Sequence, residues 1–320
     1  MVQAELVMKN KGRYIEYDAI RAICVLYIVG FWHLNSYLPS HYSFSSAWLP
    51  LLHNLTTVVL GTFTFISGSL LSKYSFSSGL DIVVFFKKRF VRFFFILLFS
   101  AITYYLLKWI SLAQTCQIVT GLNLIIGPSV TTLWFFSMII LFYLITPLIR
   151  YKYDSIITNI LICIAIFLAF IYLTITGADR RLVLYFPAYV TGLCLPTEKA
   201  VQLIRNKLLL AVSIPMLCIQ FIFSNWLAVQ ILLELFGIAS FIVICGNLRF
   251  GFLKYLAVAS MIAYLFHRQF FSLERTLFEK QGCSGIPLWA ACLGLLMLFV
   301  ISYWGQIFYD RYFTRWIKFA

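Results

Sequence analysis

Charged side chains are scarce in this sequence of 320 residues. Asp, Glu, Lys and Arg make up 11% of it, whereas a soluble domain has about 25%. Hydrophobic residues make up 62%, and the mean hydropathy is +0.92. This composition excludes an ordinary soluble domain, and no low-complexity tract or long linker is left between the apolar runs. We therefore predict one integral membrane domain over residues 1–320, for which the bilayer supplies most of the apolar surroundings.

The sequence also lacks the patterns of a signal peptide and of a metal site. Its first dozen residues, MVQAELVMKNKG, are mixed and polar, and no small-residue cleavage site follows the first apolar run. Six of the eight cysteines fall in apolar runs and none has metal-ligand spacing, so we expect no metal. Cys116 and Cys283 fall in polar connections, where they either form a disulfide or merely share one side of the membrane.

Apolar runs of roughly 20 residues, the length of a spanning helix, recur along the whole chain. Ten segments qualify, of which the sixth is short: about 19–36, 49–72, 93–112, 131–149, 156–176, 182–196, 208–223, 226–246, 252–272 and 287–309. The sequence thus predicts an all-α, polytopic transmembrane bundle of about ten spans.

Basic residues are distributed unevenly between the two sides of this bundle. If the N-terminus is cytoplasmic, 19 of the 25 Lys and Arg residues fall on the cytoplasmic side and six on the other. Because cytoplasmic loops collect Lys and Arg, the asymmetry favours an even number of spans with both termini inside. The same rule accounts for the net charge of +14, so we expect no nucleic acid partner.

The first apolar segment carries three ionisable side chains, in YDAIRAICVLYIVGFWH (17–33). Asp18 and Arg21 are spaced i, i+3 at its cytoplasmic end, and His33 lies about 18 Å further along at 1.5 Å per residue. Ionisable groups at such depth usually face a bundle interior or a wet cavity. The alternatives are that Arg21 only anchors the helix and that His33 is an interfacial histidine.

This stretch resembles the first helix of the membrane-bound acyltransferase-3 family, which carries Asp, Arg three residues later and then an apolar run ending in His. Four further stretches resemble the family in order: FTFISGSLL (63–71), FFKKRFVRFF (85–94), LWFFSMIILFYLITPLI (133–149) and SMIAYLFHRQFF (260–271). The resemblance covers residues 17 to 271.

The resemblance implies an acyl-coenzyme A–dependent O-acyltransferase of a bacterial inner membrane. Its acceptor would be a surface carbohydrate: O-antigen, capsule, exopolysaccharide or glycolipid. It implies that the phosphates of the donor, expected to be acetyl-coenzyme A, rest on Arg21, Arg89 and Arg92, whose guanidinium forks suit phosphate. We expect His33 to be the general base, with a His-acyl intermediate as a variant. Possible supporting residues are Asp18, Ser67, Trp134, Glu234, Tyr264 and His267.

One spacing departs from the family. The family places its His eleven residues after the Arg, whereas Arg21 and His33 are twelve apart. At about 100° per residue, twelve steps turn a regular α-helix to a different face. A π-bulge between them, near Cys24 or Gly30, would restore the alignment. Otherwise the protein is a degenerate, regulatory member of the family.

A transporter or flippase is the chief alternative from another functional class. It too would have about ten spans, with Arg21, Glu234 and the histidines as a substrate or proton path. The sequence shows neither the internal repeat nor the paired Gly/Pro-broken helices that are typical of such proteins. Turnover of acyl-coenzyme A would separate the two classes.

Overall fold

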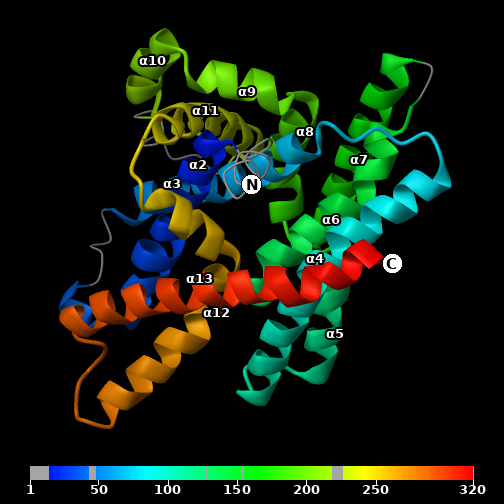
Figure 1. The fold of residues 1–320 in the computed structure, drawn as a ribbon. Helices are drawn as coiled ribbons and strands as arrows, with labels where there is room; N and C mark the ends of the chain where they lie inside the picture. Colours follow the sequence, from blue (N-terminus) through cyan, green and yellow to red (C-terminus); the bar gives the residue numbers. More distant parts are fainter. Residues whose placement is uncertain (1–13, 43–47, 127–128, 153–154, 218–225, 320) are drawn as a thin grey trace, which may run out of the picture.

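The computed structural model of the chain is a bundle of helices (Figure 1). It describes residues 14–319 apart from 43–47, 127–128, 153–154 and 218–225, and it excludes the side chains of 91–92 and 314–319. Within this described part there is no β-sheet, and the single β-bridge joins Phe76 to Tyr151. The all-α class predicted from the sequence is therefore confirmed.

Seven helical segments among the described residues are long and apolar enough to cross a membrane. The first, Ile15–Tyr37, is continuous through α2 (Ile15–Val25), the π-helix η1 (Leu26–His33) and the 3₁₀-helix η2 (Leu34–Tyr37). The other six are α3 (Leu49–Leu71), α6 (Leu133–Arg150), α7 (Ile156–Ile175), α11 (Leu227–Gly246), α12 (Leu253–Glu279) and α13 (Leu288–Phe319). The protein is thus a multi-pass membrane protein.

Three shorter apolar helices complete the pattern. They are the second half of α4 (Gly79–Leu106), α8 (Arg181–Cys194) and α10 (Lys207–Leu217). With the seven long helices they coincide one to one with the ten predicted segments. The count of ten spans and the cytoplasmic position of both termini remain predictions. The remaining short elements are η3 (Ser40–Tyr42), α5 (Leu112–Thr120), η4 (Leu122–Leu124) and α9 (Thr197–Ile204).

Helices α3 and α8 cross in close contact, and a glycine on each helix makes this contact possible. A Cβ on Gly68 of α3 would lie 2.3 Å from the carbonyl oxygen of Tyr189, and one on Gly192 of α8 would lie 2.2 Å from that of Phe65. Small residues let helix backbones approach closely in membranes, where apolar burial drives association weakly. This contact fixes the face of α3 that carries Ser67.

Helix α7 lies at the periphery of the bundle (Figure 1), and almost none of it is buried. Its exposed side chains are apolar along its whole length, as expected for a helix surrounded by lipid. Cys116 and Cys283 are both free thiols, so the disulfide considered from the sequence is not formed in this structure.

Candidate active site

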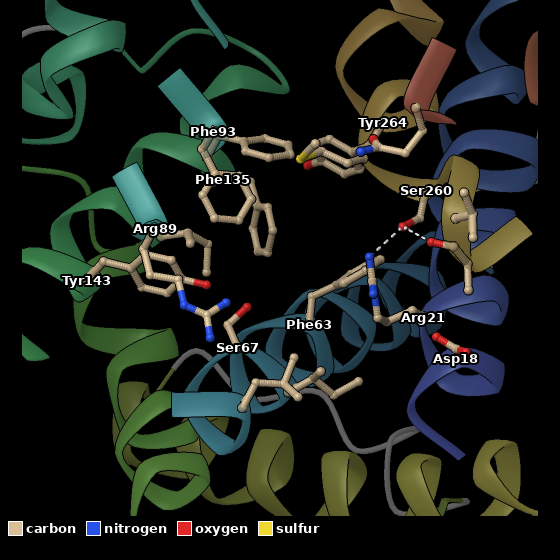
Figure 2. Close-up of a pocket in the computed structure, with 18 of the residues that line it drawn as sticks. Asp18, Arg21, Phe63, Ser67, Arg89, Phe93, Phe135, Tyr143, Ser260 and Tyr264 are labelled. Atoms are coloured by element: carbon tan, nitrogen blue, oxygen red, sulfur yellow. Dashed lines mark hydrogen bonds between the residues drawn. The ribbon is translucent and has the colours of Figure 1, made fainter. Parts of the chain in front are cut away.

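A cavity of about 260 Å³ opens at the end of the bundle where α2 begins (Figure 2). Its walls come from α2, α3, α4, α6, α12 and α13. Five of the residues singled out in the sequence line it: Asp18, Arg21, Ser67, Arg89 and Tyr264. Arg92 lies on the same helix as Arg89, but its side chain is outside the described residues.

The Arg21 guanidinium points into this cavity from α2 (Figure 2). Its Nη2 donates a hydrogen bond to the Ser260 hydroxyl of α12 at 3.1 Å, and that hydroxyl in turn donates to the carbonyl oxygen of Ala257 at 2.8 Å. Ser260 is buried, so it fixes one side of the guanidinium. Asp18, one turn before Arg21, lines the cavity beside it.

Arg89 reaches the cavity from α4 on the opposite side (Figure 2). A capping box of Ser78 and Asp81 starts this helix and sets its register. The Arg89 guanidinium lies over the Tyr74 ring, 5.4 Å from its centroid, and donates to the Tyr74 hydroxyl at 3.2 Å. Arg150 holds Tyr74 in turn, because its Nε donates to the Tyr74 carbonyl oxygen at 3.0 Å.

Sequence reasoning missed two polar residues of α13 in this cavity, Gln306 and Asp310. Asp310 could have been found as a carboxylate at the end of the last apolar run, at the level of Asp18. The cavity therefore combines two guanidinium groups, Arg21 and Arg89, with two carboxylates. Such a site can bind an anion and also groups that donate hydrogen bonds.

His33 and His267 form a pair deeper in the bundle. Nδ1 of His33 lies 2.7 Å from Nε2 of His267, and the ring planes are 5° from parallel with centroids 4.7 Å apart. Rings stacked face to face stay about 3.5 Å apart, so a separation of 2.7 Å means that these rings meet edge to edge through a hydrogen bond. His267 is fully buried and His33 is half-buried.

The hydrogen bonds of this pair determine its tautomers. Nδ1 of His267 lies 2.7 Å from the carbonyl oxygen of Tyr264, which can only accept, so this nitrogen carries a proton. His267 is neutral because an unpaired charge is costly in a fully buried position. Its Nε2 therefore accepts from Nδ1–H of His33. Nε2 of His33 is left with a free lone pair, which is the form that a general base requires.

The π-helix η1 accounts for the twelve-residue step from Arg21 to His33. It spans Leu26–His33 and includes Gly30, so the predicted irregularity between the two residues is confirmed. A π-helix turns by less per residue than an α-helix, which absorbs the additional residue. Both side chains consequently reach α12: Arg21 bonds to Ser260 and His33 to His267, two turns apart on one face.

A layer of aromatic rings separates the cavity from the histidine pair. Phe63, Phe135, Phe136 and Tyr264 all line the cavity, and the rings of Phe135 and Phe136 each lie 5.6 Å from that of Tyr264. On its far side, the Tyr264 ring lies 5.9 Å from the His267 ring. A ligand extending from the cavity to His33 would thus pass the edge of this layer.

Comparison with known proteins identifies the family. Residues 14–306 match the model of the acyltransferase-3 family, which is described as an acyltransferase domain. The chain belongs to this family. No curated protein and no solved structure matches the chain significantly. The match includes α2, α4 and α12, so the residues that carry the resemblance in this acyltransferase lie inside the matched domain.

Trp134 lies outside the cavity of the acyltransferase. The central carbon of the Arg181 guanidinium lies 4.0 Å from the centroid of the Trp134 ring. The Tyr185 ring is stacked against the same ring, with 5.9 Å between the centroids. Arg181 also forms an ion pair with Asp179. Burial alone would raise the pKa of Asp179, but the hydrogen bonds and charge of Arg181 outweigh it and lower that pKa. Trp134 therefore anchors the turn before α8 to α6.

Glu234 lies apart from both groups. It is 2% exposed, and neither carboxylate oxygen has a hydrogen-bond partner among the residues that the structure describes. It lines a small cavity of about 30 Å³ together with His53 and Arg180, whereas neither His33 nor His267 lines that cavity. The acyltransferase thus does not use Glu234 to orient its histidine pair. Among its described residues no three His, Cys, Asp or Glu side chains gather as a metal site.

Proposed function

We propose that this acyltransferase transfers an acyl group, expected to be acetyl, from acyl-coenzyme A to a hydroxyl of a cell-surface or lipid-linked carbohydrate. His33 is the general base of the reaction. The observation that carries the proposal is the hydrogen-bonded chain from His33 through His267 to the Tyr264 carbonyl, which leaves Nε2 of His33 unprotonated.

The proton transfers balance through this one nitrogen. Nε2 of His33 takes the proton of the acceptor hydroxyl as the hydroxyl oxygen attacks the thioester carbonyl carbon. The C–S bond breaks when the tetrahedral intermediate collapses, and the coenzyme A thiolate takes the proton from Nε2. His267 accepts from Nδ1–H throughout, which stabilises the transient imidazolium of His33 and holds its ring in place.

The donor binds in the cavity at the other end of α2. Its phosphates contact Arg21 and Arg89, which line the cavity. We assign Arg92 the same role because it follows Arg89 by three residues in α4. The carboxylates of Asp18 and Asp310 accept hydrogen bonds from its amide or amino groups. A cavity of about 260 Å³ is below the usual range of about 300–1,000 Å³ for ligand sites. It therefore holds part of the donor, and the pantetheine arm extends past Tyr264.

Two features support transfer over the alternatives. Family membership favours an acyltransferase over a transporter or flippase. The π-helix favours an active enzyme over a degenerate one, because it keeps the side chains of Arg21 and His33 in contact with α12 despite the longer step. The charge asymmetry of the sequence supports a donor cavity that faces the cytoplasm, where acyl-coenzyme A is found. The membrane we propose is the inner membrane of a bacterium.

Release of coenzyme A thiol by purified protein in nanodiscs tests the proposal. We expect acetyl-coenzyme A to be consumed in the presence of acceptor glycan. His33→Ala should slow transfer by about 10²–10⁴-fold while the Kd for coenzyme A stays unchanged. In cells, surface glycan should lose the mass of its acyl groups when the protein is deleted or carries His33→Ala.

His41→Ala is the matched control, because His41 is exposed and lines neither the donor cavity nor the histidine pair. It should behave as wild type. Near-wild-type transfer by His33→Ala would exclude His33 as the base, and unchanged glycan in deletion cells would exclude the proposed acceptor class.

A further inference from the structure

A second cavity, also of about 260 Å³, lies at the opposite end of the bundle from the donor cavity. Three aromatic side chains and three polar ones define its character: Tyr37, Tyr104, Trp109, Thr131, Arg268 and Ser272. None of these residues was singled out from the sequence as part of a site. In the sequence, Arg268 is one of the six Lys and Arg residues that the charge distribution assigns to the outer side.

This outer cavity adjoins the histidine pair. Arg268 follows His267 directly in α12, and Tyr37 lies one turn after His33. Two contacts hold Tyr37 in place. Its ring packs 5.7 Å from the Phe271 ring, and the Tyr37 carbonyl oxygen accepts from the backbone N–H of Ile286 at 2.9 Å. Along α12 the donor cavity ends at Tyr264, one turn before His267, and the outer cavity begins at Arg268, directly after it.

One buried polar group in this region has no hydrogen-bond partner among the described residues. Nε of Arg268 is buried without a hydrogen bond. The buried hydroxyls of Tyr104 and Thr132 are neighbours and interact with each other. Since buried polar groups are nearly always satisfied, the unpartnered Nε–H of Arg268 points to a ligand with an acceptor oxygen. The guanidinium fork of Arg268 matches a carboxylate or phosphate in particular.

The aromatic wall is built by the end of α4. Lys108 adopts a left-handed conformation (φ 58°), which reverses the chain direction. The backbone N–H of Trp109 consequently donates to the carbonyl oxygen of Tyr104 at 3.0 Å. The two rings then meet edge to face at 5.1 Å. Thr132, which follows the lining residue Thr131, also has a positive φ of 73°, which is unfavourable for a β-branched residue. Such backbone is retained where the surroundings require it, often at functional sites.

We propose that the outer cavity is the acceptor site and that it selects a sugar ring bearing an anionic group. The inference rests on the proposed function, since it assigns the substrate class of the same reaction. Arg268 binds the anionic group, Tyr104 and Ser272 bind hydroxyls, and the apolar face of the ring packs on Trp109. The volume accommodates one sugar ring, whose free hydroxyl then faces Nε2 of His33.

Binding of two small sugars tests this assignment without requiring turnover. The probes are methyl β-D-glucuronide and the neutral methyl β-D-glucoside, measured by calorimetry on full-length protein in phosphatidylcholine nanodiscs. We expect the glucuronide to bind about tenfold tighter or more, as one charge-assisted contact predicts. Arg268→Gln should abolish the preference and leave the Kd for coenzyme A unchanged. Trp109→Leu should weaken both sugars.

Arg275→Gln is the matched control. Arg275 has the same charge on the same helix, but it is paired with Glu279 and does not line the cavity. It should keep the preference. Equal binding of the two sugars, or equal loss in Arg268→Gln and Arg275→Gln, would overturn the assignment. So would displacement of the glucuronide by phosphatidylglycerol in the nanodisc, which would identify a lipid headgroup site. Failure of His33→Ala to slow transfer would instead overturn the reaction mechanism and leave the binding result standing.

Discussion

Nδ1 of His33 lies 2.7 Å from Nε2 of His267, although 234 residues separate them in the chain. The partner of His33 is thus a neutral imidazole and not a carboxylate, and the hydrogen bond from His267 to the Tyr264 carbonyl determines which nitrogen of His33 is free. His267 acts here as a positioning residue, since Nε2 of His33 is the atom that meets the substrate in the proposed reaction.

Substitutions of His267 test this role directly. His267→Leu removes the acceptor for Nδ1–H of His33, and we expect kcat to fall about 10²-fold with little change in the KM for the donor. The side-chain oxygen of His267→Gln can replace Nε2 as an acceptor and should restore part of the rate. Steady-state kinetics of both variants, with their melting temperatures, check the prediction. Equal activity of the two would contradict a hydrogen-bonding role.

Arg89 should bind donor phosphate. Arg89→Gln should weaken coenzyme A binding by about one to two decades, the value of a charge-assisted hydrogen bond. Binding of acetyl-pantetheine, which lacks the nucleotide phosphates, should change little. Lys88→Gln removes the same charge from the next residue, which is exposed and does not line the cavity, and should leave both affinities unchanged. Equal losses for both ligands in Arg89→Gln would mean that Arg89 only anchors the helix.

Gly68 should be required for the packing of α3 on α8. In Gly68→Ala the new Cβ would lie 2.3 Å from the Tyr189 carbonyl oxygen, so the helices must separate, and we expect a loss of about 1–3 kcal/mol in stability. Gly79→Ala is the control, because nothing lies within 4 Å of its added Cβ and Ala favours the first turn of α4. Thermal unfolding in detergent should give shifts of opposite sign for the two variants.

The ion pair of Asp179 with Arg181 predicts a pH dependence of stability. The pKa of Asp179 is lowered in the folded protein, so its contribution is present above the unfolded value of about 3.9 and is lost as the pH falls below it. Asp179→Asn should be less stable than wild type at pH 7 by about 1–2 kcal/mol. The difference should shrink progressively below pH 4. A difference that is independent of pH from 7 to 3 would show that the charge of Asp179 is irrelevant.

The predicted topology can be tested with the native thiols. Cys116 in α5 and Cys194 at the end of α8 are both exposed, and the charge distribution assigns them to opposite sides of the membrane. In single-cysteine variants, a membrane-impermeant maleimide should label Cys116 in intact spheroplasts. It should label Cys194 only after the membrane is permeabilised. The reverse pattern would invert the proposed positions of donor and acceptor.

Part of this protein could be predicted from the sequence. Apolar runs of spanning length predicted the helices, because a backbone in lipid must satisfy its hydrogen bonds within each segment. The twelve-residue step from Arg21 to His33 predicted a local irregularity, because a regular helix rotates by a fixed angle per residue and the spacing of two residues therefore decides whether they share a face. The π-helix η1 is that irregularity. The motifs of the first, third and ninth segments indicated the residues that the structure gathers around the donor cavity and the histidine pair.

Contacts between helices could not be predicted in this way. Three such contacts depend on which helix faces pack against each other. They are the contact of Arg181 with the Trp134 ring, the position of Asp310 in the donor cavity and the separation of Glu234 from the histidine pair. In a membrane all these faces are apolar, so hydrophobic patterning does not single out a partner.

The sequence by itself therefore determined the elements of this acyltransferase, its family and one end of its proposed site, since these follow from local length, spacing and residue type. Only the tertiary structure decided that His267 completes the His33 pair, and that Arg268, Tyr104 and Trp109 enclose a second cavity beyond it. The physical reason is that a hydrogen bond and a cavity depend on distances between side chains from separate helices. Those distances are set by close contacts such as that of Gly68 with Gly192, which no single segment specifies.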